Sequence, residues 1–243
     1  MAEIVSVNFT SCEGCRLQLT NGKSALPETL YPFDIRSVGE STAFDIALIQ
    51  GCISRDDEVQ RLTDIRRRTK ILVAYGTCAC FGGVNILKNR LTERESIREV
   101  YGDAAVHALP VETMPGIKIS DVVPVDFSIP GCPVAKEEVV RIIIGLAKGF
   151  MPALSPFNVC VECKEHQNTC FFGHREICLG PVTRAGCDAI CLSGGTSCLG
   201  CRGPADNINM AAFMKRARRI NEPALRERLG FYNAFKEVAT DEA

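Results

Sequence analysis

Four short apolar runs in the first 132 residues are each followed by Gly, Ser or Pro and then, within a few residues, by a cysteine. The runs are Ile4–Phe9, Phe44–Ile49, Lys70–Tyr75 and Val122–Phe127, and the cysteines are Cys12, Cys52, Cys78 and Cys132. Such β-rich runs, bounded by Gly, Ser or Pro, predict strands. Segments with mixed charge or helical periodicity over Asp56–Arg68, Thr92–Tyr101 and Val134–Lys148 predict helices. This alternation predicts an α/β domain with a mostly parallel sheet.

The carboxyl ends of parallel strands meet at one edge of the sheet, which is where such folds bind ligands. The cysteines after the four runs are therefore expected to converge there, although they are far apart in the chain. Neighbouring glycines would let the backbone approach a bound group closely: Gly14, Gly51, Gly76 and Gly131. The sequence thus predicts a metal site at the strand ends.

The other eight cysteines crowd into residues 160–201, in the order C-x2-C-x6-C-x7-C-x8-C-x3-C-x6-C-x2-C. Four thiolates hold one [4Fe–4S] cluster, so eight suffice for two. The N-terminal stretch MAEIVSVNFTSCEGC has no secretory signal pattern, which favours a reducing compartment and metal binding over disulfides. Tetrahedral zinc also binds paired C-x2-C motifs, and residue type alone leaves zinc open.

Composition excludes several classes of function. The 28 basic and 29 acidic residues give a net charge of −1, so neither a nucleic-acid footprint nor a polybasic membrane patch is indicated. No apolar stretch has the eighteen or so residues of a membrane span. No glycine-rich phosphate-binding motif and no Ser–His–acid arrangement is found either. We expect a cytoplasmic protein whose chemistry depends on its cysteines.

Several motifs resemble those of the small subunits of [NiFe] hydrogenases. Cys12-Glu13-Gly14-Cys15, Gly76-Thr77-Cys78-Ala79 and Pro130-Gly131-Cys132-Pro133 resemble the signature of their proximal cluster, and related motifs occur in a complex I subunit. CLGPVTRAGC at 178–187 and CLGCRGP at 198–204 resemble the second half of the hydrogenase subunit, which the complex I subunit lacks. The resemblance implies a flavodoxin-like domain over residues 1–152, a small irregular cluster domain over 153–204 and a helical tail over 205–243.

Carried over position by position, the resemblance implies three [4Fe–4S] clusters. We name their ligands the proximal set (Cys12, Cys15, Cys78 and Cys132), the medial set (Cys187, Cys191, Cys198 and Cys201) and the distal set (Cys160, Cys163, Cys170 and Cys178). Periplasmic relatives often bind the distal cluster through a histidine and have a three-iron medial cluster. This chain departs from both, with Cys160 in place of the histidine and Cys191 as a fourth thiolate. His166 and His174 flank Cys170, and either could replace it.

Two cysteines stay unassigned. Cys52 follows the second run, and Cys80 is two residues after Cys78. The simpler interpretation is a small buried hydrophobe, and the alternative is ligation of a modified proximal cluster. Gln50 stands where many relatives place a glutamate, which removes one candidate carboxylate.

The resemblance implies an electron-transfer subunit of a cytoplasmic [NiFe] hydrogenase, with the Ni–Fe centre in a separate large subunit. The electron acceptor would be NAD(P)- or ferredoxin-linked, through a flavin and iron–sulfur diaphorase or a similar subunit. Open alternatives are a complex I-like or heterodisulfide-reductase-linked coupling subunit, an H2-sensing regulatory subunit, and a zinc-held scaffold. Amphipathic segments over Met210–Arg219 and Ala224–Val238 predict tail helices that pack on the cluster domain or dock the redox partner.

Overall fold

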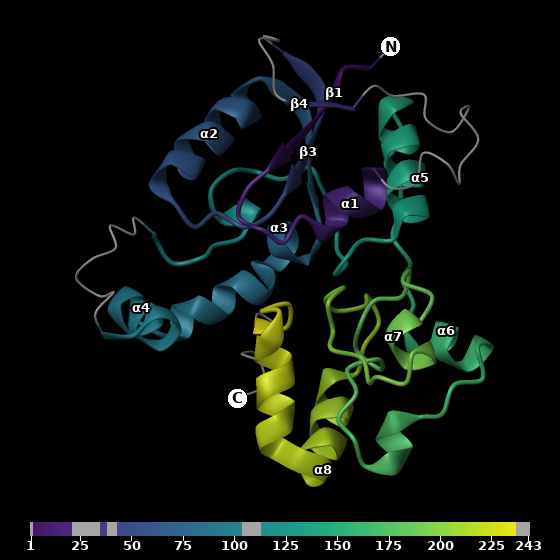
Figure 1. Ribbon diagram of the computed structural model, residues 1–243. Helices are drawn as coiled ribbons and strands as arrows, with labels where there is room; N and C mark the ends of the chain where they lie inside the picture. Colours follow the sequence, from purple (N-terminus) through teal and green to yellow (C-terminus); the bar gives the residue numbers. More distant parts are fainter. Residues whose placement is uncertain (1, 21–34, 38–42, 104–112, 237–243) are drawn as a thin grey trace.

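The computed structural model describes residues 2–20, 35–37, 43–103 and 113–236. A five-stranded parallel sheet with the order β2-β1-β3-β4-β5 forms the first half of the molecule (Figure 1). Its strands are β1 (Ile4–Asn8), β2 (Ile35–Ser37), β3 (Phe44–Gln50), β4 (Thr69–Tyr75) and β5 (Phe127–Ile129). The register pairs Ile4 with Ile46, Ile46 with Ile71, and Val73 with Phe127. The α/β class predicted from the sequence is confirmed.

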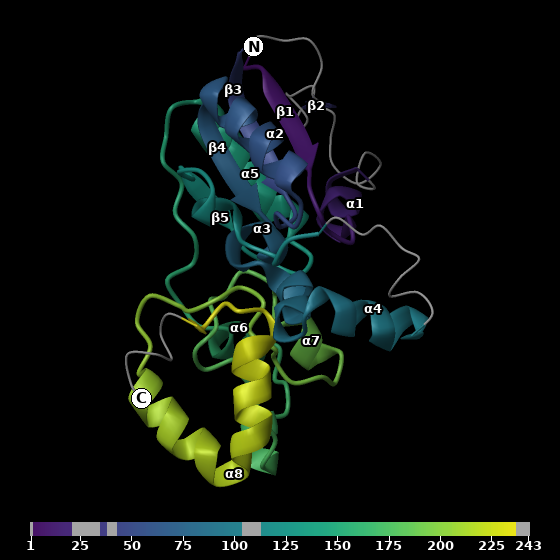
Figure 2. The same ribbon diagram turned by 90° about the vertical axis from the view of Figure 1, so that its left-hand side faces the viewer.

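Helices α2 (Asp56–Arg67) and α5 (Lys136–Ala147) cover opposite faces of the sheet (Figures 1 and 2). Alternation along the strands explains this, because successive side chains of a strand point to opposite faces. One face packs against α2 and contributes Val5, Val7, Ala47, Ile49 and Leu72 to its core. The other packs against α5 and contributes Ile4, Ile46, Leu48, Val73 and Tyr75. Burial on both faces accounts for the nearly continuous apolar run of β3.

The prediction of a strand over Val122–Phe127 is wrong in its range. The structure has a short 3₁₀ turn at Ile119–Asp121 (η4), and the strand begins only at Phe127. Pro124 has no N–H to donate to the neighbouring strand. The Asp126 carboxylate instead accepts the Leu72 N–H at 2.7 Å, which ends the ladder before β5. Strand β2 escaped prediction because three residues at a sheet edge carry too little pattern.

The other expected helices of the first half form. Helix α4 (Glu93–Tyr101) begins at a capping box in which Thr92 and Glu95 bond each other's backbone N–H groups. Shorter helices follow the strand ends, namely α1 (Gly14–Thr20), α3 (Thr77–Phe81) and the 3₁₀ helix η2 (Gly83–Arg90). They form the carboxyl edge of the sheet.

The second half lies beyond that edge and has little regular structure before its last helix (Figure 1). It contains α6 (Cys160–Glu165), the 3₁₀ turn η5 (Phe171–His174), α7 (Ile190–Ser193) and α8 (Met210–Phe231). Its own core includes Leu179, Val182, Phe213, Leu225 and Phe235. We keep the division into residues 1–152, 153–204 and 205–243 as a proposal.

The two tail helices are two limbs of α8, joined at a bend that Figures 1 and 2 both show. Asn221 leaves the helical conformation (φ −165°, ψ 100°), and Pro223 follows it. Each limb begins at an asparagine cap: Asn209 Oδ1 accepts the Ala212 N–H at 2.9 Å, and Asn221 Oδ1 accepts the Ala224 N–H at 3.0 Å. The second limb ends at Phe231, and Val238 lies outside the described residues.

No helix in the described ranges is long and apolar enough to cross a bilayer.

Arg202 joins the two halves. Its guanidinium donates to the carbonyl oxygens of Pro130 (2.8 Å) and Ala185 (3.0 Å) and to both carboxylate oxygens of Glu138 (2.8 Å each). The Arg202 side chain is 1% exposed and that of Glu138 is 9% exposed. Thr77 Oγ1 adds a 2.7 Å hydrogen bond to the Cys201 carbonyl. The segment around Cys201 is therefore fixed to the carboxyl edge of the sheet.

Candidate metal centres at and beyond the sheet edge

The proximal set lines one small cavity of about 70 Å³ at the carboxyl edge of the sheet. Its members come from three separate segments. Cys12 and Cys15 lie at the start of α1, Cys78 lies in α3 after β4, and Cys132 follows β5. Parallel strand direction brings these segments together, as expected from the sequence. Gln50, at the end of β3, also borders the cavity.

Two glycines leave room for the sulfur atoms. A Cβ at Gly76 would lie 2.7 Å from Cys15 Sγ, and one at Gly83 would lie 2.8 Å from Cys78 Sγ. Both have positive φ, +87° and +62°. Any side chain here would be strained and would also displace a thiol.

The raised pKa values of Cys15 and Cys78 indicate that the charged form of these thiols needs a positively charged group beside it. Burial raises the pKa of Cys15 to about 11, and the neighbouring Cys132 and Cys12 thiolates add to the rise. Burial likewise raises the pKa of Cys78 to about 12, with contributions from Cys132, Cys52, Cys15 and Cys12. Four thiolates in one site repel one another, so the charged form that binds metal requires a cationic centre between them.

Side chains outside the proximal set contact its sulfur atoms. Asn85 Nδ2 lies 3.7 Å from Cys78 Sγ and donates to the Thr10 carbonyl at 3.2 Å. Burial raises the pKa of Cys132, and a hydrogen bond with the Tyr232 hydroxyl opposes that rise. Tyr232 stands at the end of α8, one hundred residues after Cys132. No local sequence signal identified it.

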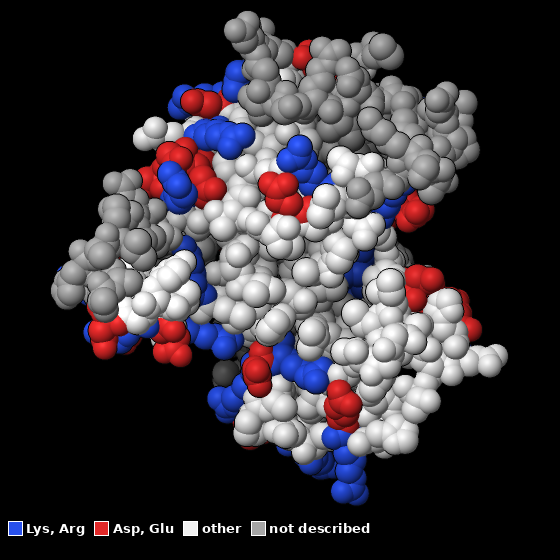
Figure 3. Space-filling model, viewed as in Figure 1, with Lys and Arg blue, Asp and Glu red and all other residues white. Residues whose placement is uncertain are grey.

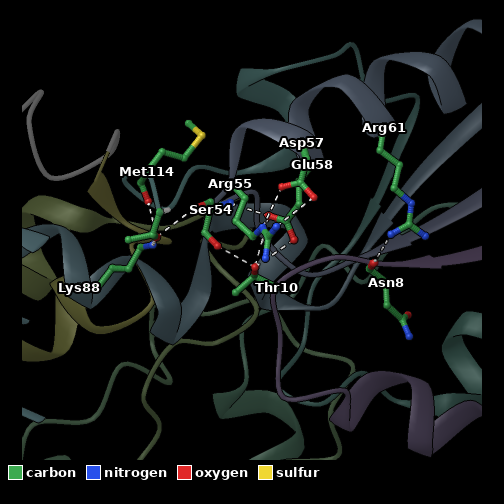
Figure 4. A network of polar contacts seen from close by, with 10 residues as sticks. Asn8, Thr10, Ser54, Arg55, Asp57, Glu58, Arg61, Lys88 and Met114 are labelled. Carbon is green, nitrogen blue, oxygen red and sulfur yellow. Dashed lines mark hydrogen bonds and ion pairs between the residues drawn. The ribbon is translucent and has the colours of Figure 1, made fainter. Parts of the chain in front are cut away.

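A polar network holds the loops behind this cavity (Figure 4). Thr10 Oγ1 lies 2.7 Å from Ser54 Oγ and donates to Glu58 Oε1 at 3.1 Å. The same Glu58 carboxylate accepts the Ser54 N–H at 2.8 Å. The network joins the loop after β1, which leads to Cys12, to the start of α2. It positions the first ligand segment without contacting sulfur.

The medial set lines a larger cavity of about 870 Å³ between the two halves, together with Cys132 and Tyr232. Burial raises the pKa of Cys201 to about 12, and Cys187, Cys132 and Cys191 raise it further. Cys132, a member of the proximal set, therefore also borders the medial cavity, as does Tyr232.

Glu162 holds the loop that carries Cys187. Its carboxylate accepts the Gly186 N–H at 2.6 Å and the Ala189 N–H at 3.2 Å, and it lies 3.8 Å from Cys187 Sγ. Glu162 stands between two distal cysteines in sequence, so its contact with a medial cysteine is a product of the fold.

The distal set gathers around α6. Cys160 and Cys163 lie one turn apart on this helix, Cys170 precedes η5, and Cys178 follows it. Burial raises the pKa of Cys160 to about 12, with further rises from Cys178, Cys163 and Cys170. The Cys198 N–H lies 3.4 Å from Cys178 Sγ, so the medial and distal sets are adjacent.

Among the described residues, neither flanking histidine contacts a cysteine of the distal set. His166 is exposed and its Nε2 lies 2.6 Å from Asp188 Oδ1. That hydrogen bond raises the pKa of His166. His174 is exposed at the end of η5.

The unassigned cysteines are both buried. Cys52 exchanges two backbone hydrogen bonds with Thr10, and burial raises the pKa of its thiol to about 11. Cys80 lies in the core under α2, with Sγ 3.5 Å from the Ala74 carbonyl oxygen. Neither borders the proximal cavity. Gln50 is also buried. Its Nε2 donates to Ser11 Oγ at 2.9 Å, while its Oε1 has no hydrogen-bond partner among the described residues.

The donor chemistry of the three sets is uniform: each consists of four thiols and no other ligand type. Within the described ranges, no three His, Cys, Asp or Glu side chains lie close enough to hold a single metal ion. A [4Fe–4S] cluster distributes its thiolates over four irons, so its ligands surround a volume instead of one point. The donor type and the glycine-lined cavity of the proximal set fit such a group.

Comparison with known proteins identifies the class. Residues 12–146 match the family described as NADH ubiquinone oxidoreductase, 20 Kd subunit. Sulfhydrogenase 2 subunit delta of Pyrococcus furiosus is 37% identical over 220 residues, covering 87% of this chain and 90% of that protein. A vhu subunit of the F420-non-reducing hydrogenase of Methanocaldococcus jannaschii is 30% identical over 235 residues, covering 82% of this chain and 81% of that protein.

Solved structures agree on the fold. A chain of an NAD+-reducing [NiFe]-hydrogenase in the H2-reduced state matches 63% of this chain and 94% of its own length, with a TM-score of 0.51 and 26% identity. A chain of the reduced Ni-Fe-Se hydrogenase from Desulfomicrobium baculatum matches 96% of this chain and 99% of its own length, with a TM-score of 0.55 and 16% identity.

The fold and these relatives define the class as the small subunits of [NiFe] hydrogenases. The chain belongs to the NADH ubiquinone oxidoreductase 20 kDa subunit family, and its similarity to the sulfhydrogenase delta subunit extends well past residue 146. The family predicted from the cysteine motifs is thereby confirmed.

Proposed function

We propose that the chain is the electron-transfer small subunit of a cytoplasmic [NiFe] hydrogenase and holds three [4Fe–4S] clusters through its proximal, medial and distal sets. Such clusters supply one-electron oxidation and reduction when bound. The observation that carries the proposal is that neighbouring sets are adjacent, which supports a row from the proximal through the medial to the distal set. Cys132 of the proximal set and Tyr232 both border the medial cavity, and the Cys198 N–H of the medial set contacts Cys178 of the distal set. Electrons would pass along such a row.

The chain's own residues would hold and insulate this row. Cys178 of the distal set and Cys198 of the medial set are buried, so these two sulfurs would be shielded from water. Backbone N–H groups and the side chains of Asn85 and Tyr232 direct hydrogen-bond donors at thiolates. Such donors tune the reduction potential of an iron–sulfur group.

Hydrogen chemistry would belong to a large subunit with the Ni–Fe centre. The sequence has three C-x2-C pairs, at 12–15, 160–163 and 198–201, and each already lies within one of the three sets. Cys12 is exposed at the proximal set. This exposure suits contact with a second subunit at that end.

The proposal also covers the protein that accepts the electrons. An NAD(P)-linked flavin and iron–sulfur diaphorase is supported by the likeness to the NAD+-reducing enzyme. A ferredoxin-linked or heterodisulfide-reductase-linked partner is the second candidate, because several relatives are F420-non-reducing hydrogenase subunits.

Anaerobic purification of the native complex tests the whole proposal. We expect about twelve iron atoms per chain, nickel in the partner subunit, and H2-dependent reduction of a dye. Zinc in place of iron, or a complete complex without nickel, would contradict it. A flavin-bearing partner would support the NAD(P) link.

Single cysteine variants test the ligand sets. Replacing Cys132 with alanine should remove about four iron atoms, or leave a three-iron cluster with a new electron paramagnetic resonance (EPR) signal. Cys52→Ala is the matched control, because Cys52 lies near the same cavity but does not border it. Equal iron loss in both variants would refute the assignment of the proximal set.

A further inference from the structure

The first limb of α8 presents four exposed cations on its outer side. They are Lys215, Arg216, Arg218 and Arg219. The inner side of the same limb, with Met210, Phe213 and Ala217, is buried in the core of the second half. The limb is therefore amphipathic, and its charged face is presented to solvent.

Among the described residues these cations have little acidic charge beside them; the pKa of Glu222 is lowered chiefly by Arg226 and least by Arg218. In the part of the chain that the structure describes, Lys215, Arg218 and Arg219 form no ion pair; those of α8 belong to its second limb, where Arg226 pairs with Glu222 and Arg228 with Glu176. The whole chain has a net charge of −1, so this concentration is local. Figure 3 shows Lys and Arg side chains gathered at the end of the molecule where α8 bends.

One residue of the basic face, Arg216, contacts the turn that follows Cys170. The Arg216 guanidinium lies over the Phe172 ring, 5.5 Å from its centroid, and Phe172 stacks on Phe213 at 5.7 Å. Phe172 is two residues from Cys170, which is exposed. Arg216 thus contacts the turn that directly follows Cys170, the most exposed cysteine of the distal set.

The shape of the face suits a protein partner. The exposed residues beside the cations are small, Ala211 and Ala212. A shallow hollow of about 470 Å³ is lined by Ala211, Met214, Lys215 and Arg218. Because a small side chain, Ala211, lies beside the long flexible cations, another protein surface can approach this hollow closely.

We propose that this face docks an acidic redox protein or domain, which exchanges electrons with the distal set. The inference rests on the proposed electron-transfer function and adds where the partner binds and what its surface carries. Complementary charge steers such encounters and fixes their orientation, and it weakens with salt. The row of cysteine sets would then end at the position where the partner is held.

The test uses the complete hydrogenase complex and two electron acceptors. An acidic ferredoxin is the protein probe, and benzyl viologen is a small dye that needs no docking face. The variant Lys215→Glu/Arg218→Glu/Arg219→Glu reverses three charges and leaves Arg216 on Phe172. We expect its KM for ferredoxin to rise about tenfold or more at low salt, with viologen reduction and cluster EPR signals unchanged.

The matched control Arg67→Glu/Arg94→Glu/Arg98→Glu makes the same change in net charge on exposed positions of α2 and α4. An equal rise in both variants would overturn the docking site, as would a wild-type complex that reduces viologen but not ferredoxin. Binding to phosphatidylserine vesicles that only the α8 variant loses, with ferredoxin kinetics unchanged, would assign the face to a membrane and also overturn it. Failure to reduce either acceptor would instead refute the proposed function.

Discussion

Replacing Arg202 with alanine should destabilise the protein severely. The guanidinium is 1% exposed, and it makes hydrogen bonds to two carbonyl oxygens and a two-pronged pair with Glu138, whose side chain is 9% exposed. Its removal leaves a buried carboxylate without its partner. Breaking a buried pair in this way costs about 3–5 kcal/mol. For a chain of this length, 1 kcal/mol shifts the melting temperature by about 2–4 °C, so we expect a fall of roughly 6–20 °C.

The assay is an anaerobic thermal melt of the cluster-loaded chain, followed by circular dichroism and by the visible absorbance of the clusters. Arg226→Ala is the matched control, because its pair with Glu222 is 78% and 47% exposed and should contribute about 0.5 kcal/mol or less. Arg202→Lys should fall between the two, since an ammonium keeps the charge but not the fork of donors. An Arg202→Ala protein that melts within about 2 °C of the Arg226→Ala control would refute this reasoning.

Three further predictions concern the cysteine sets. Tyr232→Phe should make the midpoint potential of the proximal cluster more negative in an EPR redox titration, because it removes a hydrogen bond that stabilises the reduced state; an unchanged potential would contradict this. Gly76→Ala should lose about four iron atoms by metal analysis. The control Gly149→Ala has a similar φ of +81° but nothing within 4 Å of its Cβ, so this variant should keep its full iron content. Equal iron losses in the two variants would show that backbone strain, and not displacement of a sulfur atom, causes the loss. His166→Gln should keep full iron content because His166 is bonded to Asp188; if it loses iron as Cys170→Ala is expected to do, the histidine is a ligand.

The sequence was most informative where a pattern repeats at short range. Strands β1, β3 and β4 and helices α2 and α4 were predictable, because the short apolar runs of the strands and the mixed charge of the helices lie within each element. The strand before Cys132 was misplaced, because the effect of Pro124 and the Asp126 carboxylate depends on a neighbouring strand. The family was predictable because cysteine spacing is itself a short-range pattern.

The supporting residues of the candidate site could not be predicted in the same way. Tyr232 contacts a cysteine one hundred residues away, and Arg202 contacts Glu138 across 64 residues. Arg202 was visible in the motif CLGCRGP, but its role depends on a buried carboxylate in α5. Hydrogen-bond partners of this kind are fixed by tertiary packing, which leaves no periodic trace in the chain.

The medial set comes last in the sequence but is adjacent to both other sets, and the reason lies in Arg202 and Thr77. After Cys132 the chain passes through α5, which packs on the sheet, continues to the distal set and then returns to the carboxyl edge of the sheet at Cys201. The return is fixed by the Thr77 hydroxyl on the Cys201 carbonyl and by Arg202 on the Pro130 carbonyl. These bonds hold the segment of the medial cysteines beside Thr77 and Pro130, next to the proximal cysteines Cys78 and Cys132, while the Cys198 N–H contacts Cys178 of the distal set. Loosening that junction should therefore disturb the link between the proximal and medial sets before it affects the distal set, whose cysteines are held by α6 and its neighbouring turns.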